Sequence, residues 1–220
     1  MHHLLLLCSI LFFPSCDAFS SADKNSDTVS SLLEAVQQGR LSIVEQALKN
    51  GANVHEINAQ GQSLLLIATR NNNIRMANLL LLHGADVNQQ DHIQDSPFLY
   101  AGAAGYVELV QLYLKSHARF DIYNRYGGSA LIPACERGHV AVVKLLAHTK
   151  GYPIDHVNRL GWTALLEAII LGDGSAKYID IVQILLDTGC NPDIADKYGV
   201  SPLQHAKNRG FDQIVQLLAN

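Results

Sequence analysis

Short apolar segments recur along most of this chain and alternate with polar loops. Residues 64–68 carry apolar side chains at a spacing that suits one face of a helix, and residues 76–81 do so again. The pattern therefore predicts two short helices in succession. Asn72 and Gly84 follow them, at sites where a residue of left-handed conformation commonly ends a helix.

The helix pair repeats along the chain with a period of about 33 residues. Segments beginning at Gly61, Gln94 and Gly127 resemble one another over their whole length. Such self-similarity predicts a solenoid, in which each unit buries its apolar face only against its neighbours. We expect an all-α repeat solenoid of about six helix-turn-helix units joined by hairpin-type loops. Phased on the leading glycine, the units are 28–60, 61–93, 94–126, 127–160, 161–198 and 199–220.

Two units break this period. The fourth has one extra residue near Lys150, and the fifth has about five more, which place Gly172–Lys177 between its two predicted helices. A glycine-rich run that ends in lysine invites comparison with a phosphate-binding loop, but the spacing does not fit that motif and no strand precedes it. We interpret the insertion as a lengthened turn, with a contact to a partner as the alternative.

These repeats resemble the ankyrin-repeat family. The motifs that carry the resemblance are GHVAVVKLL at 138–146 and LLLLHGADVN at 79–88, and the similarity extends over residues 29–220. The resemblance implies a non-catalytic array that binds a partner protein on a concave surface. In that family the hairpin tips and the exposed inner helices form this surface.

The residues at the predicted hairpin tips are largely aromatic or basic. The candidate partner-binding residues are His92, Ile93, Arg125, Tyr126, Arg159, Leu160, Trp162, Lys197 and Tyr198. Tyr, Trp and Arg often anchor protein interfaces, so Trp162 is the strongest single candidate. Tyr126, Leu160 and Tyr198 could instead pack against neighbouring tips. If Arg125, Arg159 and Lys197 align, we expect the partner to have an acidic surface.

The first 18 residues differ from the rest of the chain and predict a secretory signal peptide. Their apolar run at 4–13 is too short to span a bilayer as a helix. Residues 13–16 resemble a bacterial lipobox, which makes Cys16 a candidate lipidation site. Cleavage after Ala18 is the alternative. Residues 19–28 form a polar linker, and we expect an exported protein of a bacterial envelope, either periplasmic or membrane-anchored. Secretion to act on host proteins is a second possibility.

Composition narrows the remaining classes of function. A net charge of -4 does not suit a nucleic-acid binder, and the four cysteines are too scattered for a zinc site. The chain also lacks the G-x-S-x-G, H-E-x-x-H and dinucleotide-binding motifs, so we expect no catalytic residues, cofactor or metal. We also expect a monomer. The competing hypothesis is a ligand binder or enzyme that uses the Gly172–Lys177 insertion with His156 or Trp162.

Overall fold

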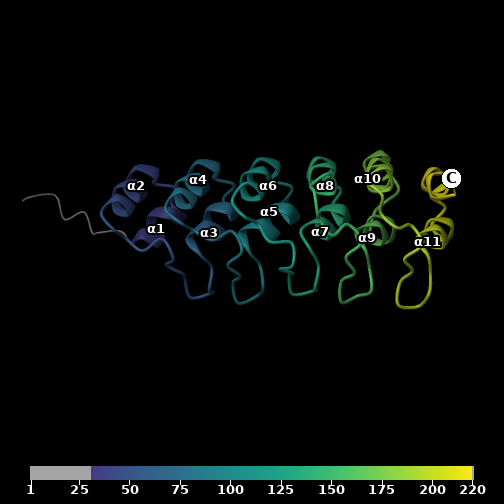
Figure 1. Ribbon diagram of the computed structural model, residues 1–220, viewed down its shortest axis with the longest axis horizontal. Coiled ribbons are helices and arrows are strands. Elements are labelled where there is room, and N and C mark those ends of the chain that lie inside the picture. Colours follow the sequence, from purple (N-terminus) through teal and green to yellow (C-terminus); the bar gives the residue numbers. More distant parts are fainter. Residues whose placement is uncertain (1–30, 220) are drawn as a thin grey trace, which may run out of the picture.

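The computed structural model describes residues 31–219, which form an elongated stack of helix pairs (Figure 1). Within this range twelve helices follow one another, and the isolated bridge between Ile57 and Ser63 is the one β contact. The helices are α1 (Leu32–Gln37), α2 (Leu41–Lys49), α3 (Leu64–Arg70), α4 (Ile74–Leu82), α5 (Pro97–Ala104), α6 (Val107–Leu114), α7 (Leu131–Glu136), α8 (Val140–Ala147), α9 (Ala164–Ile170), α10 (Ala176–Asp187), α11 (Pro202–Asn208) and α12 (Asp212–Leu218).

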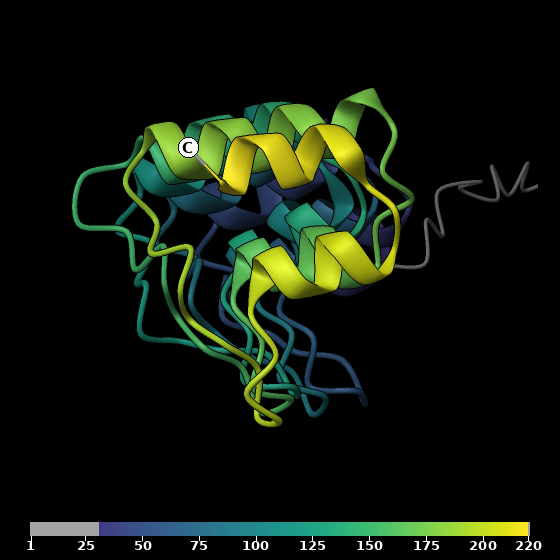
Figure 2. The same cartoon turned by 90° about the vertical axis from the view of Figure 1, so that its right-hand side faces the viewer.

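The helices form two layers, and long hairpin loops project from one side of the stack (Figure 2). Odd-numbered helices make the inner layer beside the hairpins, and even-numbered helices make the outer layer. Within each layer a helix packs on the next one, as α7 does on α9 and α8 does on α10. Apolar side chains of both layers form one continuous core. The architecture confirms the predicted all-α solenoid.

The inner helices begin at similar points because a hydroxyl side chain caps most of them. Five such oxygens accept the backbone amide three residues further on: Ser31, Ser63, Ser96, Thr163 and Ser201. This contact satisfies an amide that the helix cannot pair internally. The predicted left-handed turn after the inner helix is also present, with φ of 48° at Asn72 and 76° at Gly138.

The insertion in the fifth repeat corrects one prediction. Ala176 and Lys177 belong to α10, which has 12 residues, so only the first part of Gly172–Lys177 is a turn. The added helical turn forms because it buries Tyr178, whose hydroxyl donates to the carbonyl of Glu136 at 2.8 Å. Arg209 of the sixth repeat donates to the carbonyl of Gly172, also at 2.8 Å. The insertion is therefore tied to the repeats on both sides.

The predicted signal peptide, the candidate lipidation site Cys16 and the linker at 19–28 lie outside the described residues. Between residues 31 and 219, no helix combines the length and apolar character that crossing a membrane requires.

Candidate functional site

Each hairpin is built around one Asn or Asp side chain. Its Oδ1 atom accepts the amides of the residues two and four positions further on, at 2.9 to 3.0 Å. The five residues are Asn58, Asp91, Asn124, Asn158 and Asp196. Because these bonds hold the backbone of the turn, the side chains at the tip are not needed to form it.

Neighbouring tips are also joined to one another. The amide of Arg159 donates to the carbonyl of Tyr126 at 2.9 Å, and its guanidinium donates to the carbonyl of Arg125 at 2.8 Å. The amide of His92 makes a similar bond to Gln60 at 3.1 Å. The hairpin tips at the ends of the third and fourth repeats are therefore held in register with each other.

Most of the predicted tip residues are solvent-exposed. The exposed fractions are 77% for Tyr198, 54% for Tyr126, 49% for Ile93 and 42% for Leu160. The basic tip residues and His92 are exposed as well. Trp162 differs because it is half-buried, and its backbone carbonyl accepts the amide of Asn158 at 3.0 Å. The structure thus places Trp162 at the base of its hairpin.

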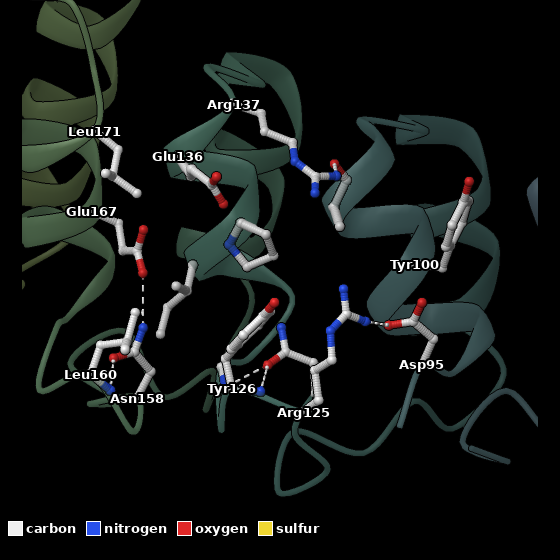
Figure 3. Close-up of a pocket in the computed structure, with 15 residues that line it drawn as sticks. Asp95, Tyr100, Arg125, Tyr126, Glu136, Arg137, Asn158, Leu160, Glu167 and Leu171 are labelled. Carbon is white, nitrogen blue, oxygen red and sulfur yellow. Dashed lines mark hydrogen bonds and ion pairs between the residues drawn. The ribbon is translucent and has the colours of Figure 1, made fainter. Parts of the chain in front are cut away.

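A groove of about 490 Å³ lies between the hairpins and the inner helices of the third to fifth repeats (Figure 3). The predicted residues that line it are Arg125, Tyr126 and Leu160. The inner helices α5, α7 and α9 contribute Tyr100, Pro133 and Glu167 respectively. Arg159 instead lines a second hollow of about 450 Å³, together with Tyr123 and His156. The predicted tip residues therefore line two different hollows.

The charged groups at the third-repeat end of the groove are paired. A carboxylate oxygen of Asp95 lies 3.2 Å from Arg70 and the other lies 3.7 Å from Arg125. The Arg70 guanidinium also stacks 4.7 Å from the ring centroid of Tyr100. Burial raises the pKa of Asp95, the nearby charge of Asp91 raises it further, and the arginines oppose both effects.

The fifth-repeat end of the groove holds a buried carboxyl group, that of Glu167, which is 4% exposed. The side-chain amide of Asn158 donates to its Oε1 atom at 2.8 Å. Nothing in residues 31–219 forms a hydrogen bond with the other oxygen, Oε2. Burial raises the pKa of Glu167 to about 7, with a further contribution from the negative charge of Glu136, while the Asn158 bond lowers it.

Two of the basic tip residues lie against the aromatic ring next to them in the chain. The guanidinium of Arg125 is 4.9 Å from the ring centroid of Tyr126, and the ammonium of Lys197 is 5.1 Å from that of Tyr198. These contacts lie within the range of cation–π attraction. Each pair presents a flat aromatic surface and a positive charge at the same tip.

The cysteines of the described chain are poorly suited to nucleophilic chemistry. Burial raises the pKa of the Cys135 thiol well above its usual value and raises that of Cys190 to about 12. A reactive cysteine needs the opposite shift, because the thiolate is the nucleophile. No group of three or more His, Cys, Asp or Glu side chains in residues 31–219 is arranged to hold a metal ion.

The sequence-based prediction named the tips but missed the inner wall of the groove. The missed lining residues include the charged and aromatic ones, which are Asp95, Tyr100, Glu136, Arg137 and Glu167. A signal for some of them existed in the repeat register. The residue four positions after each inner-helix hydroxyl varies freely in type along the array: Ile67, Tyr100, Pro133, Glu167 and His205. A charged residue in the apolar segment 164–170 is conspicuous in that register.

Comparisons with known proteins agree with the repeat architecture. Residues 3–91 and 98–196 match the family described as Ankyrin repeats (3 copies). The chain is 40% identical over 187 residues to the ankyrin repeat protein YahD of Escherichia coli, covering 84% of this chain and 92% of that protein.

Solved structures show the same similarity. An ankyrin repeat domain from Acinetobacter baumannii is 48% identical with a TM-score of 0.83, covering 86% of this chain and 95% of that one. The ankyrin repeat protein EF0377 is 41% identical with a TM-score of 0.84, covering 87% and 98%. With the stacked helix pairs and projecting hairpins described above, these matches show that the chain belongs to the ankyrin-repeat family, whose repeats generally mediate protein–protein interaction.

Proposed function

We propose that this protein is a non-catalytic scaffold that binds a partner protein along the groove and the hairpin tips beside it. The observation that carries the proposal is the exposure of Tyr126 and Leu160 at the rim of the groove. Exposed aromatic and aliphatic side chains around a polar hollow are typical of interaction sites. The ankyrin fold, typically a non-enzymatic interaction scaffold, suits this role.

The charge of the tips supports a partner with an acidic surface. Arg125, Arg159 and Lys197 are all exposed, and they occupy equivalent positions in successive hairpins. Asp95 neutralises part of the Arg125 charge, so Arg159 and Lys197 contribute more to long-range attraction.

Partner capture from a crosslinked culture of the source cells tests this function. Replacing Tyr126 and Leu160 together with Ala should reduce the amount of captured partner at least about tenfold, since anchors at an interface centre often contribute 2 kcal/mol or more. The matched control is Leu82→Ala, because Leu82 is 76% exposed on the outer helix α4 and away from the groove. Equal capture by the double variant and the wild type would refute the proposed surface.

The charge hypothesis has its own variant. Replacing Arg125, Arg159 and Lys197 with Glu should slow association and weaken binding, most clearly at low ionic strength. Undiminished binding in 50 mM salt (a low ionic strength, at which screening extends over roughly 14 Å) would remove the acidic partner from the proposal.

We also propose that the protein acts in the bacterial cell envelope after export, with secretion to host proteins as the second candidate. The N-terminal sequence supports this proposal through its apolar run and its lipobox-like residues. Mass spectrometry of the protein purified from its own cells distinguishes a lipidated Cys16 from cleavage after Ala18. An unprocessed N-terminus that starts at Met1 would contradict export by this signal.

A further inference from the structure

The carboxyl group of Glu167 is an unusual feature of the groove wall. Its side chain comes from α9 and points into the groove toward Asn158, with Glu136 on the facing helix α7 (Figure 3). Only 4% of the residue is exposed. Burying a polar group without a hydrogen-bond partner costs free energy, and burying a charge without one costs more.

Two other acids, the partly buried Asp95 and the buried Asp196, have basic partners within the chain. Asp95 lies against Arg70 and Arg125, and the carboxylate of Asp196 contacts the imidazole of His205 at 2.9 Å. In the described part of the chain, Glu167 has only the amide of Asn158. The fifth repeat therefore presents an acid for which the chain supplies no cation.

The surroundings of Glu167 define which cation would fit. Because Oε1 already accepts from Asn158, the position left open is the single oxygen Oε2. A guanidinium binds carboxylates best through two parallel bonds, whereas an ammonium is a compact donor that needs one oxygen at a time. The groove beside it is also lined by Tyr126, Pro133 and Leu160, which suit an alkyl stem.

We propose that the groove accommodates a lysine side chain of the partner protein, with its alkyl stem along Pro133 and its ammonium bound to Glu167. Glu136 lines the same groove and adds a second negative charge for the ammonium. This inference rests on the proposed function, because it names the group that the partner would insert. Acidic residues of the same partner would meet Arg159 and Lys197, which do not line this groove.

Access to Oε2 requires a change of side-chain rotamer at the groove wall. The Oε2 atom is covered in the structure. Leu171 and Leu160 line the groove and are 47% and 42% exposed, so these two side chains are not packed on all sides. Such rotamer changes are common when interfaces form, and they leave the backbone in place.

The test uses the full chain labelled with ¹³C at the glutamate carboxyl carbon, and Nα-acetyl-lysine-N-methylamide as the probe. Titration followed by NMR should give a saturable shift of the Glu167 signal. That signal is assigned by its loss in Glu167→Gln. Affinity measured by backbone amide shifts should fall at least about tenfold in Glu167→Gln, in keeping with the loss of one charge-assisted hydrogen bond. Glu108→Gln, on the exposed side of α6, is the matched control and should bind as the wild type does.

Two further probes determine whether binding depends on recognition of the ammonium group. The Nε-acetylated form of the same compound keeps the stem but removes the charge, and the arginine analogue keeps the charge but changes its shape. We expect no saturable binding of the acetylated probe and weaker binding of the arginine probe. Equal binding of either, no response to the lysine probe, or full affinity in Glu167→Gln would overturn the proposal.

The outcome is separable from that of the proposed function. If partner capture depends on Tyr126 and Leu160 but the lysine probe does not bind, the scaffold function stands and the lysine pocket is refuted. If the probe binds at Glu167 but capture is unaffected by the groove variants, the pocket stands and the proposed surface for the partner is refuted.

Discussion

The inner helices of the fifth and sixth repeats each contact the hairpin residue that precedes them, but the two contacts differ in chemistry. In the sixth, the imidazole of His205 lies 2.9 Å from a carboxylate oxygen of Asp196. In the fifth, the amide of Asn158 lies 2.8 Å from a carboxylate oxygen of Glu167. Each pair joins the hairpin Asn or Asp to the inner-helix residue nine positions later. In the Asp196–His205 pair an acid contacts a base. In the Asn158–Glu167 pair, the Oε2 atom of the buried acid has no hydrogen-bond partner among the described residues.

This difference shows where an ankyrin array can vary without losing its fold. The hairpin residue must accept two backbone amides, and both Asn158 and Asp196 do so. The side chain of the inner-helix residue does not accept these backbone amides, so this residue can be an acid in one repeat and a base in the next. Recognition can therefore change while stacking is preserved.

The largest effect is expected from Asn158→Ala. The substitution removes two hairpin hydrogen bonds and the only side-chain donor to Glu167 within the described chain. We expect a loss of about 4 kcal/mol in the free energy of unfolding, measured by urea denaturation. Asn124→Ala is the control, because it removes the equivalent two hairpin bonds in a repeat where Pro133 occupies the position of Glu167. We expect it to cost about 2 kcal/mol. Equal losses would show that the Asn158–Glu167 contact contributes nothing.

Glu167→Gln tests the contribution of the Glu167 carboxyl group to the pH dependence of stability. In the folded state, burial raises the pKa of Glu167 from its ordinary value of 4.5 to about 7. The folded state thus holds the proton more tightly, and stability falls as pH rises between these two values. Glutamine does not ionise, so the variant should gain up to roughly 3 kcal/mol relative to the wild type at pH 8 and little at pH 4.

Urea denaturation of both proteins across this pH range measures the effect. The charged neighbour that raises the pKa of Glu167 is Glu136, and Arg125 and Arg137 line the same groove. His205 occupies the equivalent position of the next inner helix. A stability difference that is constant from pH 4 to pH 8 would contradict the raised pKa of Glu167.

Exchanging the Asn158–Glu167 pair for the residue types of the Asp196–His205 pair sharpens the comparison. The double variant Asn158→Asp with Glu167→His reproduces the Asp196–His205 pair at the fifth position. Each single change leaves an unsuitable pair, so a double-mutant cycle should give a favourable coupling of about 1 to 2 kcal/mol. The lysine probe should no longer bind this variant. Additive free energies would show that the local backbone does not support the exchange.

The smallest effect is expected for His205→Gln. The pKa of Asp196 is lowered chiefly by the backbone amide of Val200, with a smaller contribution from His205, so the carboxylate keeps its main partner. We expect a loss of less than about 1 kcal/mol at pH 6, measured by urea denaturation. A loss as large as that of Asn158→Ala would mean that the histidine, and not the hairpin, holds this carboxylate.

Much of the fold could be predicted because the repeat supplies the same information several times. Ser96 and Thr163 both cap an inner helix, and Asn72 and Gly138 both turn the chain after one. The end of the insertion could not be predicted, since the start of α10 depends on burial of Tyr178 against the preceding repeat. Register also located Tyr126 and Leu160 at the tips, but not the burial of Glu167.

The sequence by itself determined the all-α solenoid, the hairpin-tip column and the irregular fifth repeat, because periodic patterns and turn residues act locally. The tertiary structure alone decided which tips line the groove and which charges have partners. Asp95 meets Arg70 and Arg125, whereas Glu167 meets only an amide among the described residues. Such pairings depend on how neighbouring repeats stack. The identity of an acidic residue in the sequence does not show whether its carboxyl group is solvated, paired or buried.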